Sequence, residues 1–250
     1  MSGEAIICMI DIANYSAWCK RLRKRPEHIF NVMFDYNEHI CTFLRRYDRL
    51  RKIELVGDSI VVVGMIGDSP TSQTTYIQTL AFVSDVLSHV PRMKIDFAEE
   101  SISVRIGIHI GRVYGGYMRY PRRFQIFGNP VNVASRLQSK TEDGSVLITN
   151  KSVDRVTVER HYSDSNESSK EGGSVRASLD IKEGSTWHPM ATLDGQFTLD
   201  ADELERRSAD FDKISRMRRT SAGYESFKGV GDYAVSRLHS FDTESPSSSN

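Results

Sequence analysis

Hydrophobic and polar positions along this chain follow two different spacings. Short runs rich in isoleucine and valine have the pattern of buried strands, and they cover residues 5–12, 52–56, 60–64, 103–110 and 146–148. Residues 26–47 and 72–89 instead carry apolar side chains three and four positions apart, which predicts helices with one buried face. A third helix is expected to begin near Pro130, and a further strand is expected over residues 117–127.

The tripeptide Gly-Asp-Ser at residues 57–59 separates two of the predicted strands. Small polar residues between strand-like runs indicate a tight hairpin, so we expect Asp58 at its tip. Asp11 lies near the end of the first predicted strand. Both carboxylates are therefore expected at the ends of strands.

The composition changes beyond the last of these strands. Residues 163–186 are dominated by Ser, Glu, Asp, Lys and Gly, which is typical of a flexible insertion. We predict the main part of one domain over residues 1–162, a polar and largely flexible insertion over 163–222, closing strands over 223–240 and a disordered tail over 241–250. The order of elements predicts an α+β fold with a ferredoxin-like βαββαβ core and additional antiparallel strands.

Charge and cysteine content narrow the class of protein. Lysine plus arginine and aspartate plus glutamate both number 33, so no overall field attracts nucleic acid, and we expect no nucleic-acid partner. No stretch approaches about 18 apolar residues, and no basic segment precedes the first apolar run, so we expect neither a membrane span nor a signal peptide. Cys8, Cys19 and Cys41 lack metal-ligand spacing and suit packing roles in a reducing, cytoplasmic compartment.

Asp11 and Asp58 are candidate metal ligands. Two carboxylates at neighbouring strand ends can hold a pair of hard divalent cations, which keep positions for water and for the phosphate oxygens of a substrate. An aspartate at a strand end also serves as a cap, and a Gly-Asp pair also serves as a turn. The pair alone therefore leaves a structural role open.

Four segments carry a family resemblance in the order MIDIANYSAW, KIELVGDSIVVVG, VRIGIHIGRVYGG and RFQIFGNPVNVASRL. They resemble the signature segments of class III nucleotidyl cyclase catalytic domains. The similarity covers residues 5–150 and resumes at ESFKGVGDYAVSRL, whereas residues 163–222 have no counterpart. The resemblance implies attack of the ribose 3′-hydroxyl of a nucleoside triphosphate on its α-phosphate, with release of pyrophosphate.

The resemblance also implies roles for individual residues. Asp11, Asp58 and the backbone carbonyl of Ile12 match the ligands of two divalent cations, Mg²⁺ or Mn²⁺. Asn132 and Arg136 match the pair that orients the ribose and holds the charge developing on the α-phosphate. Four residues apart, these two share one face of a helix. Taken alone, Arg136 would be read as a solvated helix residue.

Glu54 and Gln125 stand where the family reads the base. The Glu54 carboxylate can accept from the N1–H and the amino group of guanine, and the Gln125 amide can donate to O6. Adenine would present a lone pair to Glu54 at a cost of about 1–3 kcal/mol, which favours GTP. Gln125 can also present its oxygen, so an adenylate cyclase stays as the alternative. Lys228 is similar to the family's phosphate-contacting lysine, although Val230 departs from the usual Lys-Gly-Lys-Gly pattern.

In this family the active site lies between two catalytic domains. One supplies the metal aspartates, and the other supplies the base-reading residues with the asparagine and the arginine. Because this chain carries every part, the resemblance implies a homodimer with two equivalent sites. A catalytically silent nucleotide-binding partner would lack one of these parts, and a diguanylate-forming enzyme would carry a GGDEF-type hairpin. We therefore predict a guanylate cyclase that makes cyclic GMP for intracellular signalling.

Overall fold

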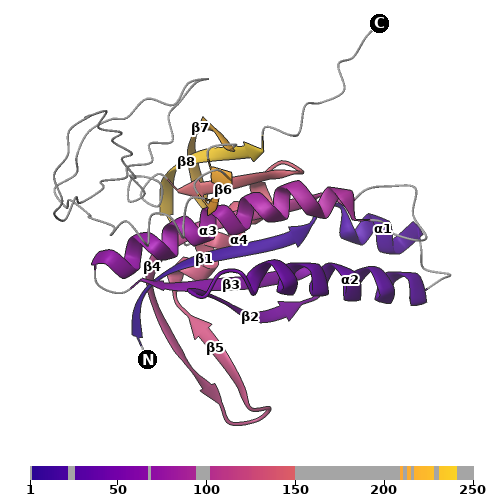
Figure 1. The fold of residues 1–250 in the computed structure, drawn as a ribbon, viewed down its shortest axis with the longest axis horizontal. Helices are drawn as coiled ribbons and strands as arrows, with labels where there is room; N and C mark the ends of the chain where they lie inside the picture. Colours follow the sequence, from indigo (N-terminus) through magenta and orange to yellow (C-terminus); the bar gives the residue numbers. More distant parts are fainter. Residues whose placement is uncertain are drawn as a thin grey trace, which may run out of the picture.

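The computed structural model describes residues 2–21, 26–66, 69–93, 102–149, 209–210, 213–214, 217–227 and 231–240. The elements in chain order are β1 (Ser2–Ile12), α1 (Tyr15–Arg21), α2 (Pro26–Leu44), β2 (Leu50–Val56), β3 (Ser59–Ile66), α3 (Ser69–His89), the short 3₁₀ helix η1 (Val90–Arg92), β4 (Val104–Met118), β5 (Arg123–Phe127), α4 (Asn129–Lys140), β6 (Ser145–Thr149), β7 (Met217–Phe227) and β8 (Gly231–Ser240). The strands form one sheet in the order β2-β3-β1-β4-β6-β8-β7, and β5 pairs with β4 (Figure 1).

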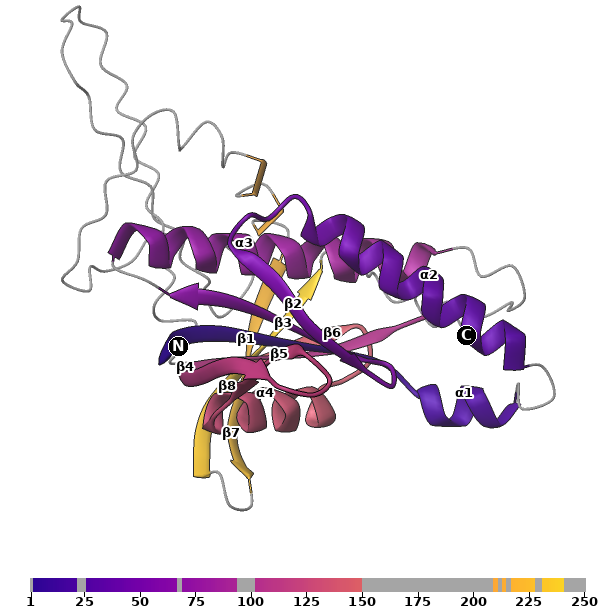
Figure 2. The same cartoon turned by 90° about the horizontal axis from the view of Figure 1, so that it is seen from below.

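Helices cover both faces of this sheet. Figure 2 shows α2 and α3 on one face and α4 on the other. The strand order β2-β3-β1-β4, with helices between β1 and β2 and between β3 and β4, is the ferredoxin-like arrangement. The predicted α+β fold is therefore confirmed. Within the described residues, no helix is both long enough and apolar enough to cross a membrane.

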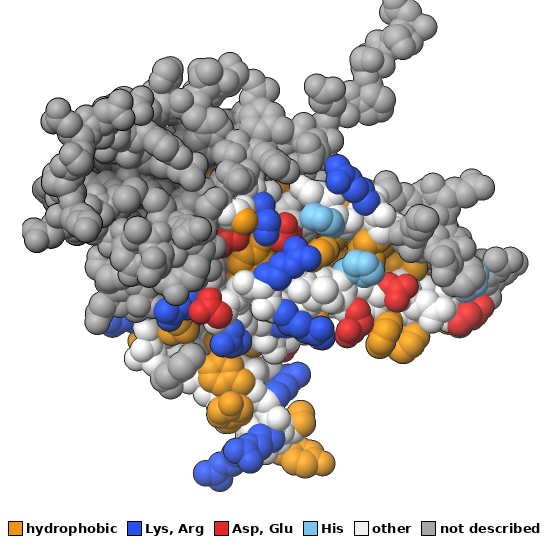
Figure 3. All heavy atoms as spheres, in the orientation of Figure 1, with side chains coloured by type: hydrophobic (Ala, Val, Ile, Leu, Met, Phe, Trp, Pro, Cys, Tyr) orange, Lys and Arg blue, Asp and Glu red, His pale blue; other side chains and the backbone are white. Residues whose placement is uncertain are grey.

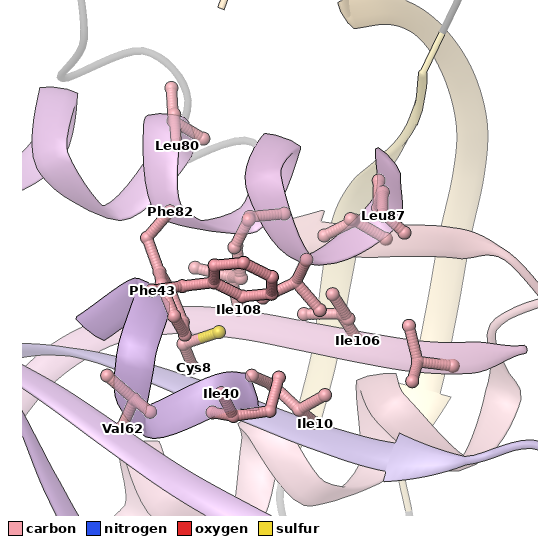
Figure 4. Close-up of a cluster of buried hydrophobic side chains, with 14 of the residues drawn as sticks. Cys8, Ile10, Ile40, Phe43, Val62, Leu80, Phe82, Leu87, Ile106 and Ile108 are labelled. Atoms are coloured by element: carbon pink, nitrogen blue, oxygen red, sulfur yellow. The ribbon is translucent and has the colours of Figure 1, made fainter. Parts of the chain in front are cut away.

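The two faces of β1 bury alternate side chains in separate cores. Even-numbered residues from Ile6 to Ile12 pack with α2 and α3 in the larger cluster, part of which is drawn in Figure 4. Odd-numbered residues from Ala5 to Met9 pack with Ala134 of α4 in the smaller cluster. Because side chains alternate along a strand, Asp11 continues the odd-numbered series and faces α4.

Helix α4 approaches the sheet closely at Gly107. A Cβ atom at this position of β4 would overlap the backbone of Ala134 and Gln138, so only glycine permits the approach. Since α4 has these backbone atoms against β4, the C-terminal part of the helix lies next to the end of β1. The close approach therefore determines which α4 side chains can reach Asp11.

Two predicted boundaries differ from the structure. Residues 117–127 are not one strand, because β4 continues to Met118 and returns as β5, with Tyr114 paired to Phe127 at the open end of this hairpin. Strand β7 begins at Met217, before the predicted closing strands, and Ile214 and Met217 are buried in the larger core. Residues 163–208, which are most of the predicted insertion, and the tail lie outside the described residues, so their flexibility stays a prediction.

Candidate active site

Asp11 is held at the end of β1 by donors from two other elements. The guanidinium of Arg105 donates to Asp11 Oδ2 at 3.1 Å, and the side-chain amide of Gln138 donates to the same oxygen at 2.9 Å. Arg105 stands opposite Asp11 in the register of β1 with β4. The side chain of Asp11 is only 16% exposed. Its carboxylate is thus largely removed from water and fixed in orientation.

Asp58 lies in the turn between β2 and β3, and its side chain contacts that of Asp11. Gly57 has a φ of 62°, which a tight hairpin turn requires and glycine adopts without strain. Burial, a hydrogen bond with the side chain of Asp11 and the charge of Asp11 together raise the pKa of Asp58 to about 6. The backbone amides of Asp58 and Ile12 oppose this rise. The fold therefore brings together two carboxylates that are distant in the sequence.

This carboxylate pair fits a divalent cation. Two ionised carboxylates in contact repel each other, and a cation between them removes the repulsion. Oxygen ligands suit Mg²⁺ and Mn²⁺, and the backbone N–H of Ile12 donates to the Asp58 carboxylate, so Ile12 lies beside the pair. In the described part of the chain, no set of three or more Asp, Glu, His or Cys side chains forms a larger cluster. The side chains that fit a metal are thus those of Asp11 and Asp58, with Ile12 beside them.

Tyr15 of α1 carries a hydroxyl within electrostatic range of Asp58. Burial, a hydrogen bond with Cys19 and the charges of Cys19 and Asp58 raise the pKa of Tyr15 to about 12. The hydroxyl of Tyr15 therefore stays protonated at neutral pH and acts as a neutral polar group near Asp58.

Asn132 and Arg136 lie on the outer face of α4. The helix buries Pro130, Val133, Ala134, Leu137 and Gln138 against the sheet. Asn132 and Arg136 are exposed, as their four-residue spacing on one helix face predicts. Arg136 precedes Gln138 by two residues, which is about 200° around a helix. Gln138 reaches Asp11, so the asparagine and the arginine point away from the aspartates of their own chain.

Glu54 of β2 and Gln125 of β5 lie side by side. With the Gln125 amide nitrogen turned to Glu54, Nε2 is 3.4 Å from Glu54 Oε2. With the amide turned over, its oxygen accepts from Nη2 and Nε of Arg123 at 2.8 and 3.0 Å, and the surrounding groups favour this orientation. Nη1 of Arg123 is also 4.0 Å from Glu54 Oε2. The two predicted base-reading residues therefore form a cluster with Arg123.

Sequence reasoning missed three residues of these clusters, namely Arg105, Gln138 and Arg123. Arg123 could have been found, because it lies two residues from Gln125 on the same face of β5. Arg105 and Gln138 had no local signal, since their contacts with Asp11 depend on the pairing of β1 with β4 and on the packing of α4. The predicted phosphate-contacting residue Lys228 lies outside the described residues.

Comparison with known proteins places this geometry in one family. Residues 2–182 match the model of the adenylate and guanylate cyclase catalytic domain. The germination-specific adenylate cyclase of Dictyostelium discoideum is 26% identical over 153 residues, 60% of this chain and 17% of that protein. The guanylate cyclase soluble subunit beta-2 of Rattus norvegicus is 32% identical over 150 residues, 55% of this chain and 20% of that protein. The chain thus spans only about a fifth of these relatives.

Solved structures have the same fold. The guanylate cyclase domain of RhGC from Catenaria anguillulae, in complex with GTP, superposes with a TM-score of 0.59 at 15% identity, covering 96% of this chain and 98% of that one. The adenylyl cyclase CyaB from P. aeruginosa superposes with a TM-score of 0.61 at 14% identity, covering 95% of this chain and 94% of that one. Both substrate types occur among the similar proteins. The chain belongs to the family of adenylate and guanylate cyclase catalytic domains, the class III nucleotidyl cyclases.

Proposed function

We propose that this chain is a guanylate cyclase domain that converts GTP to cyclic GMP and pyrophosphate in the cytoplasm, as a homodimer. Family membership supports the reaction class, and the contact between Asp11 and Asp58 supports its metal dependence. The observation that carries the choice of GTP is the bond from Arg123 to the Gln125 amide.

The reaction needs a means of activating the ribose 3′-hydroxyl and steadying the triphosphate. Two divalent cations, Mg²⁺ or Mn²⁺, held by Asp11, Asp58 and the Ile12 carbonyl would supply this Lewis acidity when bound. Asp11 and Asp58 therefore act as ligands rather than as nucleophiles. Arg105 lies 3.1 Å from Asp11 Oδ2, so its guanidinium is placed to bind phosphate oxygens that arrive at this site.

Asn132 and Arg136 act on the reacting nucleotide. The carboxamide of Asn132 orients the ribose, and the guanidinium of Arg136 holds the charge that develops on the α-phosphate during transfer. These roles follow from the match of Asn132 and Arg136 to the family's segment. Lys228, carried over in the same way, would contact the triphosphate.

The base is read by Glu54 and Gln125. Glu54 accepts from the two adjacent donors of guanine, N1–H and the amino group. When the Gln125 oxygen is engaged by Arg123, its NH₂ group is left to donate, and guanine O6 is the acceptor that suits it. Adenine offers a donor at this position and would leave the NH₂ group unpaired, which costs about 1–3 kcal/mol or roughly ten- to a hundredfold in selectivity.

An adenylate cyclase is the second candidate. It is favoured by the contact of the Gln125 amide nitrogen with Glu54, because this orientation turns the amide oxygen away from Arg123 and makes it an acceptor for the adenine amino group. A catalytically silent nucleotide-binding partner is less well supported, since Asp11, Asp58, Asn132 and Arg136 are all present.

A homodimer follows from the direction of α4. Asn132 and Arg136 point away from their own Asp11, so a second copy must bring its pair to the aspartates. The β4–β5 hairpin supports association, because Tyr117 and Tyr120 are 71% and 95% exposed on it. Figure 3 shows orange and blue side chains on this hairpin. Exposed aromatic groups beside arginines are common in protein interfaces.

The experiment is product analysis with the purified chain. GTP and ATP are supplied separately with Mg²⁺ or Mn²⁺, and products are identified by chromatography and mass. Cyclic GMP made at least about tenfold faster than cyclic AMP is expected. Preferential cyclic AMP would replace this proposal by the adenylate cyclase, and the absence of either product would favour the silent partner. Asp58→Asn serves as the control for contaminating cyclases.

A further inference from the structure

The buried face of α4 contains one side chain that packing does not explain. Its neighbours on this face are Pro130, Val133, Ala134 and Leu137, all of which are apolar. Gln138 continues the face and is only 6% exposed. Burial of an amide is unfavourable unless its groups are hydrogen-bonded. A leucine would fill such a position without this cost, so the amide of Gln138 needs a reason beyond packing.

The amide of Gln138 is directed at Asp11. Gln138 Nε2 donates to Asp11 Oδ2 at 2.9 Å across a sequence separation of 127 residues. The approach of α4 to Gly107 fixes the distance between them, because the backbone of Gln138 itself lies against that glycine. Gln138 is therefore supported by the fold on one side and holds a carboxylate on the other.

Gln138 and Arg105 both donate to Asp11 Oδ2, but Gln138 is neutral and Arg105 is positively charged. A divalent cation competes with the Arg105 guanidinium for Asp11, since both are cations and repel each other. The neutral Gln138 amide has no such conflict, and its bond to Asp11 can persist while a cation binds. Donors that hold a ligating carboxylate in this way set its orientation and commonly change metal affinity by about ten- to a hundredfold.

We propose that Gln138 is a positioning residue for the metal site, which orients the Asp11 carboxylate before and during metal binding. This proposal rests on the proposed function in assigning a divalent cation to Asp11 and Asp58. Gln138 itself touches neither the nucleotide nor the cation. Its effect is on how tightly the metal binds, with little effect on the rate at saturating metal.

The chain contains a matched control in Gln78. Gln78 is also a fully buried glutamine, and its amide nitrogen donates to an aspartate, Asp48. It lies on α3, on the opposite face of the sheet from α4. Gln78→Met therefore removes the same kind of bond as Gln138→Met, together with the bond that Gln78 Oε1 accepts from the Arg49 backbone N–H, without touching the aspartates of the candidate metal site.

The test measures Mn²⁺ binding to the whole purified chain without nucleotide, by electron paramagnetic resonance of free Mn²⁺. Gln138→Met is expected to weaken Mn²⁺ binding about tenfold, while Gln78→Met leaves it within about twofold of wild type. Gln138→Asn keeps an amide but withdraws it from Asp11. The Asn variant should weaken binding in the same direction, and it carries the test if the Met variant does not fold.

A second readout separates positioning from catalysis. The Mg²⁺ concentration for half-maximal activity should rise about tenfold in Gln138→Met, with a less than about threefold change in kcat at saturating Mg²⁺. Equal Mn²⁺ affinity in wild type and Gln138→Met, with a loss of thermal stability like that of Gln78→Met, would overturn the proposal. Because Mn²⁺ binding is measured without turnover, this result is distinguishable from failure of the proposed cyclase activity, which appears as absence of product.

Discussion

The two halves of the candidate site are built in opposite ways. Asp11 and Asp58 are in contact with each other, and Arg105 and Gln138 hold Asp11 from two elements. Asn132 and Arg136 stand exposed on α4, and within the described part of the chain no side-chain hydrogen bond holds either of them. The carboxylates are thus fixed by the fold of one chain, whereas the asparagine and the arginine are presented outward.

This difference follows from what each half must do. Two adjacent carboxylates repel each other, so surrounding donors must hold them in place before a cation arrives. In the proposed function, Asn132 and Arg136 act only on a bound nucleotide and so need no partner in their own chain. The contrast is what the proposed homodimer requires, in which each chain would carry two half-sites and a second chain would complete each of them.

The largest effect is expected from the buried half. Asp58→Asn removes a metal ligand and should lower kcat roughly a thousandfold, because the cations supply most of the charge stabilisation of the transition state. Initial rates with GTP at saturating Mg²⁺ measure this loss. A loss of less than about tenfold would mean that Asp58 does not bind the metal.

The exposed half should lose rate without losing stability. Arg136→Ala is expected to lower kcat roughly a hundredfold, since it removes one charge from the transition state. Its melting temperature should stay within about 1 °C of wild type, because an exposed side chain without a described partner contributes little to folding. Steady-state kinetics and calorimetry check both statements. A clearly lower melting temperature would contradict the outward-facing geometry of α4.

A smaller effect is expected on the selectivity for GTP over ATP, which tests the roles of Glu54 and Gln125 in reading the base. Arg123→Ala frees the oxygen of Gln125 and should lower the ratio of kcat/KM for GTP to that for ATP roughly tenfold. The neighbouring Arg122 is the matched control, because its guanidinium lies over the ring of Tyr117, 5.8 Å from the ring centre. Arg122→Ala should leave the ratio unchanged. An equal change in both variants would attribute the effect to charge in general.

The smallest effect is a pH dependence of stability. The fold raises the pKa of Asp58 from 3.8 to about 6, so the folded state binds its proton more tightly than the unfolded state does. Protonated Asp58 therefore stabilises the folded state, and this stabilisation is lost as the pH rises through about 6. Without metal, wild type should gain about 1–2 °C in melting temperature relative to Asp58→Asn between about pH 7.5 and pH 5. Calorimetry with chelator present measures the difference, and parallel curves for the two proteins would contradict the contact with Asp11.

Local sequence pattern predicted the parts of the site that depend on nearby residues. The Gly57 turn placed Asp58 at a hairpin tip, and the four-residue spacing placed Asn132 and Arg136 on one helix face. Contacts that depend on the register of distant strands were not predictable in this way. Arg105 meets Asp11 only through the pairing of β1 with β4. Gln138 meets it only because α4 lies against Gly107.

The first half of strand β7 was not predicted from the sequence. Its first residues, Met-Arg-Arg-Thr-Ser, lack the apolar alternation of a half-buried strand. Pairing with β8 supplies the hydrogen bonds that define it. Hairpin pairing with β8 therefore overrides local composition at this edge of the sheet.

The most direct test of the two-chain site is complementation between two inactive variants. Asp58→Asn and Arg136→Ala are each purified, assayed for cyclic GMP formation, then mixed in equal amounts and allowed to exchange subunits. Half of the dimers then pair one chain of each kind, and one of their two sites is intact, so about one quarter of wild-type activity should return. Activity that stays at the level of the separate variants, although subunit exchange is demonstrated, would show that each site is completed within a single chain.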